Sequence, residues 1–85
     1  MPASNRTEIR EQLLKFLIET FPLFIADAPD DLPVADHGVD SLGLTNIVLF
    51  LEQHFQIGID DSEITRANLG TVKTLVDFVE RKINS

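Results

Sequence analysis

The chain has 85 residues, of which 14 are acidic and 7 basic, so its formal net charge is −7. This charge argues against nucleic-acid binding, because phosphate backbones are bound by basic surfaces. The chain has no cysteine, which excludes disulfides and thiol nucleophiles. Its apolar runs are shorter than the roughly 20 residues of a membrane span, and its polar start does not resemble a signal peptide. We therefore expect one soluble cytoplasmic domain, residues 1–85, that binds or carries rather than catalyses.

The first amphipathic segment, residues 7–21, predicts a helix. Asn5 followed by Glu8 has the form of a capping box, which indicates the start of this helix. Pro22 disfavours helical geometry at Phe21 and indicates its end. Five apolar residues recur at helical spacing and predict the buried face: Ile9, Leu13, Phe16, Leu17 and Phe21.

Residues 22–40 form a long connection with three prolines and five aspartates. A connection of this length inside a small domain is unusual and often functional. Its apolar residues predict that it packs on the core and is ordered. The aspartates lack the spacing of a calcium-binding loop, so we interpret them as a solvated acidic surface. His37 is expected to be an exposed loop residue.

Residues 41–56 predict a second helix, with Asp40 as its N-cap. Its predicted core stripe is Leu44, Ile47, Val48, Leu51 and Phe55. Leu49 and Phe50 lie off this stripe, so they are either partner contacts or members of a wide buried face. His54 is expected on the exposed side of the helix.

The C-terminal part of the chain predicts two more helical segments. Residues 56–61 read as an extended linker, and a short helical turn is expected around residues 62–66. A last helix is expected from Thr71, its N-cap, to about Ile83, with its core stripe at Val72, Leu75, Val76, Val79 and Ile83. Together the segments predict an all-α bundle of three main helices and one short helix, with a long loop between the first two.

The tract most informative about function is Gly38–Leu42 (GVDSL), at the mouth of the second helix. The hydroxyl of Ser41 is expected to be exposed where the loop meets the helix. Unpaired N–H groups and the positive end of the helix dipole would stabilise a phosphate esterified to it. Gly38 gives the approach conformational freedom. Asp40 and Leu42 flank the hydroxyl with a charge and an apolar contact that an enzyme could recognise.

Gly-x-Asp-Ser-Leu at the start of an amphipathic helix, in an acidic domain of this size, resembles the acyl carrier protein family. Residues 51–59 (LEQHFQIGI) and the pattern of residues 71–79 resemble later segments of the family, so the resemblance covers about residues 7–83. It implies that Ser41 receives 4′-phosphopantetheine from coenzyme A. The thiol of this arm would hold acyl or aminoacyl groups as thioesters, so the cofactor would supply the sulfur that the chain lacks.

The same resemblance implies partners and a cargo site. A phosphopantetheinyl transferase, an acyl- or aminoacyl-loading ligase or transferase, and synthase enzymes with basic or apolar docking surfaces are the expected partners of a monomeric carrier. Asp40, Leu42 and Leu49 are expected to contact the transferase and pathway enzymes. The expected lining of an acyl pocket is Leu51, Ile59, Ile64 and Leu69.

Some positions depart from the family pattern. Gly43 and Asn46 stand where fatty-acid carriers have acidic residues, and His37 replaces a leucine. Residues 65–72 form a slightly longer segment than in housekeeping carriers, and Ile64 would fill volume that a long acyl chain needs. These departures favour a specialised or secondary-metabolite pathway with short or polar cargo over housekeeping fatty acid biosynthesis.

Two other classes of function fit the sequence less well. An unmodified helical interaction adaptor would not need a hydroxyl at Ser41. A hydrolase with Ser41 as its nucleophile would need a histidine and a carboxylate to activate it, and no recognised pattern supplies them. The two histidines are far apart in sequence and do not indicate a metal site.

Overall fold

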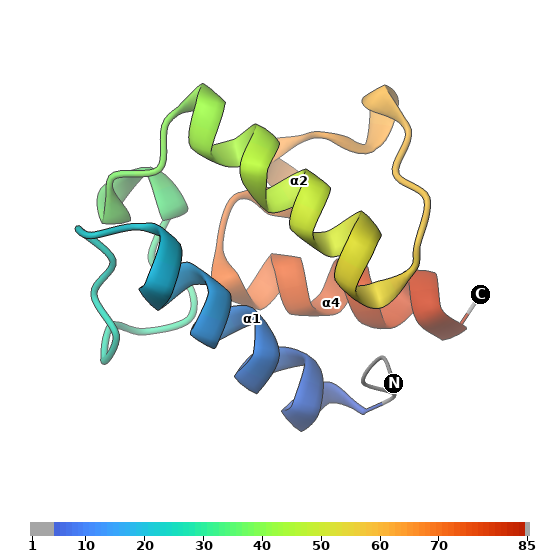
Figure 1. Ribbon diagram of the computed structural model, residues 1–85, viewed down its shortest axis with the longest axis horizontal. Helices are drawn as coiled ribbons and strands as arrows, with labels where there is room; N and C mark the ends of the chain where they lie inside the picture. The colour runs from blue at the N-terminus through green and yellow to red at the C-terminus, as the bar shows by residue number, and fades with distance from the viewer. Residues whose placement is uncertain (1–4, 85) are drawn as a thin grey trace.

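The computed structural model describes residues 5–84, and these residues form helices and connecting segments. The α-helices are α1 (Arg6–Thr20), α2 (Ser41–Phe55), α3 (Arg66–Leu69) and α4 (Val72–Asn84), and the 3₁₀ helices are η1 (Val34–His37) and η2 (Asp61–Glu63). In Figure 1, α1 and α2 run in similar directions across the view, α4 lies between and behind them, and α1 packs against α4. The predicted all-α fold, with three main helices and a long first connection, is confirmed.

The main helices begin at the residues that the sequence indicates. The Asn5 side chain accepts a hydrogen bond from the Glu8 N–H at 2.9 Å, which caps α1. The Phe21 N–H donates to the Leu17 carbonyl at 3.0 Å and closes its last turn before the proline. The Thr71 hydroxyl oxygen accepts from the Thr74 N–H at 3.0 Å at the start of α4. Such caps satisfy backbone groups that have no partner within the helix.

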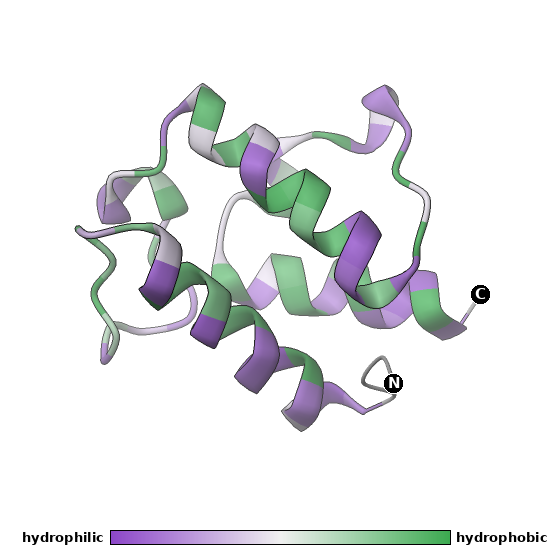
Figure 2. Cartoon of the chain, in the orientation of Figure 1, coloured by the Kyte–Doolittle hydropathy of each residue, from purple (hydrophilic) through white to green (hydrophobic). Residues whose placement is uncertain are grey.

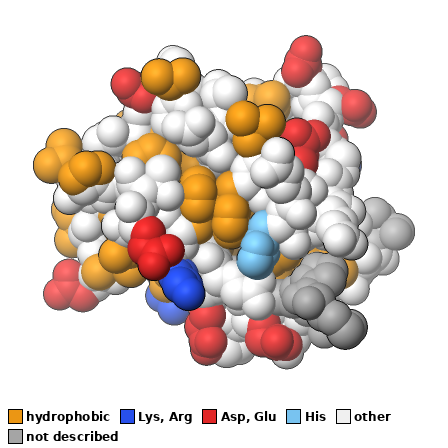
Figure 3. Space-filling view, in the orientation of Figure 1, with side chains coloured by type: hydrophobic (Ala, Val, Ile, Leu, Met, Phe, Trp, Pro, Cys, Tyr) orange, Lys and Arg blue, Asp and Glu red, His pale blue; other side chains and the backbone are white. Residues whose placement is uncertain are grey.

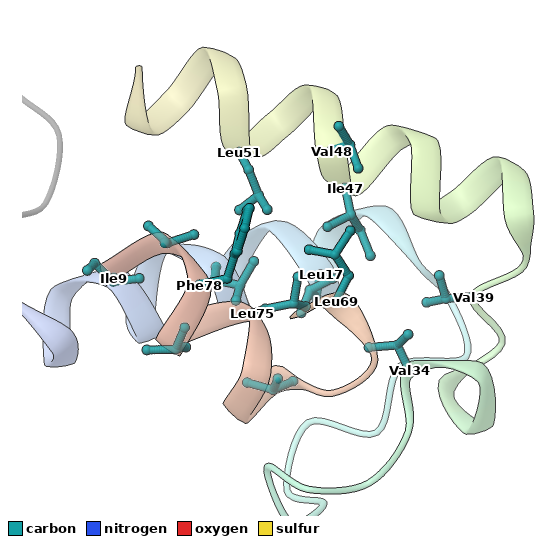
Figure 4. Packing of buried hydrophobic residues seen from close by; sticks show 14 of the residues in the cluster. Ile9, Leu17, Val34, Val39, Ile47, Val48, Leu51, Leu69, Leu75 and Phe78 are labelled. Atoms are coloured by element: carbon teal, nitrogen blue, oxygen red, sulfur yellow. The ribbon is translucent and has the colours of Figure 1, made fainter. Parts of the chain in front are cut away.

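One hydrophobic core joins the helices, and polar residues cover their outer faces (Figure 2). In Figure 4, Leu51 points from α2 toward Phe78 of α4, and Ile47 points from α2 toward Leu17 and Leu69. The predicted stripes supply most of the core, although Leu44, Phe16 and Ile83 are half-buried. The fully or nearly fully buried helix residues are Ile9, Leu13, Leu17, Ile47, Leu51, Phe55, Leu69, Val72, Leu75, Val76, Phe78 and Val79.

The long connection is ordered, as predicted, and hydrogen bonds attach it to the helices. The Val34 N–H donates to the Gly70 carbonyl at 2.9 Å, and the Lys73 N–H donates to the Asp30 carbonyl at 3.0 Å. The side chain of Arg10 on α1 makes two hydrogen bonds to the Asp30 carboxylate, at 2.7 and 2.8 Å. This guanidinium holds the pKa of the Asp30 carboxyl below its usual value. The connection also contains η1, which the sequence did not predict.

The expectation that His37 is exposed is wrong, because its side chain is only 1% exposed. Its ring stacks on Phe24 with 4.1 Å between centroids. Its Nδ1 accepts a hydrogen bond from the Ile25 N–H at 3.0 Å. Burial lowers the pKa of this imidazole, although the nearby Asp36 carboxylate acts in the opposite direction. The resemblance noted above implies a leucine at this position, and this was the available signal of burial, since leucine is most often buried.

The segment between α2 and α4 also differs in detail from the expectation. One short turn was predicted near residues 62–66, but there are two: η2 and, three residues later, α3. The Thr65 hydroxyl oxygen accepts from the Asn68 N–H at 3.2 Å and caps α3. α3 carries Leu69 into the core, and Arg66 and Leu69 of this helix border the site described next.

Within residues 5–84 no helix is both long enough and apolar enough to cross a bilayer. The same part of the chain has no cluster of three or more histidine, aspartate or glutamate side chains that could hold a metal ion. The two histidines belong to different aromatic contacts.

Candidate functional site

Ser41 is the first residue of α2, and its side chain is exposed. The Asp40 carboxylate accepts a hydrogen bond from the Gly43 N–H at 2.8 Å, which confirms Asp40 as the N-cap. The helix start leaves the N–H groups of Ser41 and Leu42 without an intrahelical partner. Within residues 5–84 the Ser41 hydroxyl makes no hydrogen bond, so it is available to an external group beside the positive end of the helix.

Gly38 brings the chain from η1 to this helix start. Its φ is +82°, in the left-handed region, where a side chain is strained. A Cβ at this position would lie 3.0 Å from the Leu23 Cβ, so the contact with the loop also requires glycine. The Val39 N–H then donates to the Val34 carbonyl at 3.2 Å and fixes the turn. The glycine of the motif is therefore needed to place Ser41.

Gly43 shows why the first turn of α2 lacks an acidic side chain here. A Cβ on Gly43 would lie 2.8 Å from the Phe21 ring and 3.2 Å from a methyl group of Val39. The end of α1 thus occupies the space in which a side chain at this position would begin. Asn46, the other departure from the family pattern, is exposed on the same helix.

A groove of about 740 Å³ adjoins Ser41, between η1, the start of α2 and the α3 segment. Most of its lining is apolar. The polar part consists of two hydroxyl side chains, one carboxylate and one guanidinium. The full lining is Pro33, Val34, Ala35, Val39, Asp40, Ser41, Leu44, Ile64, Thr65, Arg66, Leu69 and Gly70. A group attached to Ser41 could therefore lie against a mostly apolar surface.

Two of the four residues expected in an acyl pocket lie in this groove, and two do not. Ile64 and Leu69 contribute to the lining. Leu51 is completely buried in the core, and Ile59 is half-buried against it. The groove instead uses Leu44 and residues of η1, because the long connection folds back beside α2. From the sequence these residues were not expected in a pocket, although Val39 lies within the motif and Leu44 is two residues after it.

The three residues expected to contact partners are all exposed. Asp40 lies beside the serine, and Leu42 and Leu49 are 72% and 47% exposed on α2. Phe50 is half-buried and stacks on Phe16 with 4.0 Å between centroids, so it belongs to the packed face. Figure 3 shows apolar side chains gathered in the middle of the face formed by α1 and α2, with carboxylates mostly toward its edges.

Neither histidine is placed to activate Ser41. His37 is buried under Phe24 and does not line the groove. His54 is exposed, as expected; its Nε2 lies 2.6 Å from the Gln12 Oε1, and its ring stacks on Phe50. In the described part of the chain neither histidine lines the groove with Ser41, and the Asp40 carboxylate is engaged as the N-cap, so the geometry does not support a serine hydrolase.

Residues 11–79 match the family model described as "Phosphopantetheine attachment site". The chain therefore belongs to this family of phosphopantetheine-dependent carrier proteins. Their cofactor is a 4′-phosphopantetheine arm, and the protein is a non-catalytic carrier. An exposed serine at a helix N-terminus, next to a largely apolar groove, fits such an arm. Family membership also implies a transferase that attaches the arm and pathway enzymes that use it.

Curated relatives include carriers with two kinds of name. The D-alanyl carrier protein of Streptococcus mutans is 29% identical over 79 residues, which are 92% of this chain and 99% of that protein. The acyl carrier protein of Buchnera aphidicola is 31% identical over 75 residues, which are 87% of this chain and 91% of that protein. The solved structure of an acyl carrier protein from Thermotoga maritima matches this structure with a TM-score of 0.76 and 24% sequence identity. The match covers 93% of this chain and 91% of that chain, which shows that the two share a fold.

Proposed function

We propose that Ser41 carries the 4′-phosphopantetheine arm and that the protein transports acyl intermediates as thioesters on the thiol of that arm. The observation that supports this most directly is the unpaired, exposed Ser41 hydroxyl at the first turn of α2. A phosphodiester there lies close to free N–H groups and to the positive end of the helix dipole. The apolar groove beside it offers the arm or its cargo a surface to rest on.

The tether explains how a small chain can serve several enzymes. A flexible arm converts each encounter with a partner active site into an effectively intramolecular one, which raises the local concentration of the bound group. The expected partners are the phosphopantetheinyl transferase, an acyl- or aminoacyl-loading enzyme, and synthases. We assign their contacts to Asp40, Leu42 and Leu49, whose exposure supports this role. We further propose that the carrier works as a monomer in the cytoplasm.

A specialised pathway is favoured over housekeeping fatty acid biosynthesis. The first turn of α2 has no acidic residue, and a side chain at Gly43 would require the Phe21 ring to shift. Partners that dock by charge complementarity would therefore meet a different surface from the family's usual one. Ile64 in the groove, together with polar groove residues, supports a short or polar cargo.

Chain-length preference tests this part of the proposal. Arms carrying a C4 and a C12 acyl group are loaded onto Ser41, and the thermal midpoints of the two forms are compared with that of the unloaded arm. A group that is buried against the folded protein stabilises the native state and raises the thermal midpoint. We expect C12 to raise the midpoint no more than C4, because the groove gives the additional length of the C12 chain no further surface to bury. Greater stabilisation by C12 would favour the housekeeping role.

The attachment site is tested by intact mass after incubation with coenzyme A and a broad-specificity transferase. The wild-type chain should gain the mass of one phosphopantetheine. Ser41→Ala should gain none while keeping its fold, because a serine at a helix start contributes at most about a kcal/mol. Ser62→Ala is the matched control, since Ser62 is exposed in the short helix η2. Loading of Ser41→Ala, or failure of the wild type to load, would refute the proposal.

A further inference from the structure

Among the described residues, Arg66 is the one basic residue that lines the groove next to Ser41. The groove has one other ionisable residue, Asp40, whose carboxylate already caps α2 through the Gly43 N–H. Within residues 5–84, no carboxylate lies within ion-pair distance of the Arg66 guanidinium. The groove therefore presents a positive charge that no neighbouring residue neutralises.

The unpaired state of Arg66 is unusual in this chain, where acidic side chains are twice as numerous as basic ones. Four of the seven basic residues form ion pairs with carboxylates, and a fifth binds an amide oxygen and lies over an aromatic ring. These five are Arg6, Arg10, Lys73, Lys82 and Arg81. The remaining two are Arg66 and Lys15; Lys15 is exposed on α1, outside the groove.

Arg66 is exposed, and the first part of its side chain lies beside Gly70 in the groove. A Cβ at Gly70 would lie 3.0 Å from the Arg66 Cγ, so the methylene chain passes directly over this glycine. Gly70 is itself part of the lining, and its N–H donates to the Arg66 carbonyl at 2.9 Å. The glycine thus leaves room for the stem along the groove.

We propose that Arg66 is a specificity residue that binds a carboxylate at the free end of the cargo, so that the cargo class is acyl groups ending in a carboxylate. This inference rests on the proposed function, and it names the substrate class of the same site. A guanidinium binds a carboxylate through two parallel hydrogen bonds, which gives geometric selectivity as well as charge. An apolar chain end gains nothing from this group, and the ammonium of an aminoacyl cargo is repelled by it.

The other anion on a loaded arm is the phosphodiester. That group is attached to Ser41 on α2, where the free N–H groups of the helix start already stabilise it. Arg66 belongs to α3, a different element of the groove lining. Both residues line the same groove, and the experiment below separates the two anions.

The test uses two cargos of the same shape and different charge. Succinyl and 4-methylpentanoyl arms are loaded from their coenzyme A thioesters onto the wild type, Arg66→Gln, Arg66→Lys and the control Lys15→Gln, and loading is verified by intact mass. Thermal midpoints are measured for both loaded forms, for the form with a bare arm and for the unmodified chain. Arginine Nε–H resonances are recorded by NMR as a second readout.

We expect Arg66→Gln to lower the midpoint of the succinyl form by about 2–5 °C more than that of the 4-methylpentanoyl form. Arg66→Lys should retain part of this difference, Lys15→Gln should not change it, and 1 M salt should reduce it. The Arg66 Nε–H resonance should shift with the succinyl cargo alone.

Two results would overturn the inference while leaving the proposed function intact. In one, Arg66→Gln lowers the thermal midpoints of both loaded forms and of the bare-arm form equally, and leaves that of the unmodified chain unchanged. This result would show that Arg66 binds the phosphodiester. In the other, Arg66→Gln has no cargo-dependent effect. If the wild-type chain takes up no arm at all, the proposed function fails and this inference fails with it.

Discussion

Replacing His37 by leucine tests the physical account of the buried connection. In the folded chain the imidazole accepts the Ile25 N–H through Nδ1, while its Nε2 is buried without a hydrogen-bond partner in the described residues. A buried polar group without a partner costs about 1–3 kcal/mol, and a typical hydrogen bond contributes about 0.5–1.5 kcal/mol. His37→Leu removes both effects and keeps an apolar side chain of similar size against Phe24. It also frees the Ile25 N–H, which can pair with water because Ile25 is 46% exposed.

The balance of these two effects favours the leucine variant by about 1 kcal/mol at pH 7, which corresponds to a rise of about 4–8 °C in the thermal midpoint of a domain this small. The advantage should grow as the pH falls. Burial lowers the pKa of His37 below 6.5 in the folded state, so the unfolded chain binds more protons between these two values. Wild-type stability is therefore complete above about pH 6.5 and is lost as the pH falls toward the folded pKa.

The assay is thermal or urea unfolding of the wild type, His37→Leu and His54→Gln between pH 5 and pH 7.5. The His54 variant serves as the control, because its ring is exposed and contacts Gln12 at the surface. His37→Leu should show a weaker loss of stability toward pH 5 than the wild type, and the control should follow the wild type. A leucine variant that is less stable at pH 7, or that keeps the full pH dependence, would refute this reasoning.

Two further predictions concern stability and placement of the site. Leu51→Ala should lower the free energy of unfolding by about 2–5 kcal/mol, because Leu51 is completely buried. Leu49→Ala should change this free energy little and should slow loading of the arm. Denaturant unfolding and loading kinetics measure the two effects, and a large stability loss for Leu49→Ala would contradict its exposed position. Gly38→Ala should lower the free energy of unfolding by about 1 kcal/mol or more and should also slow loading, because it strains the turn that presents Ser41. Unchanged stability and loading would show that the turn tolerates a side chain.

Much of the fold could be predicted from local patterns. Apolar residues at helical spacing identify the buried faces of α1, α2 and α4, and Asn5, Asp40 and Thr71 start these helices with the capping bonds expected of them. These features are predictable because helix periodicity and capping depend on residues within one or two turns of each other. The motif around Ser41 is local in the same sense, since it needs one turn and one helix start.

Contacts between distant segments were decided by the tertiary structure. His37 is buried because Phe24 and Ile25 fold over it, and Gly43 has no room for a side chain because the end of α1 reaches it. Periodicity shows which face of a helix is apolar, but it does not show which other segment covers that face. For the same reason Leu44, which lies on the same predicted core stripe as the buried Leu51, lines the groove instead. The meeting of Ser41 and Arg66 in one groove, 25 residues apart in the chain, likewise depends on how the long connection and α3 pack beside α2.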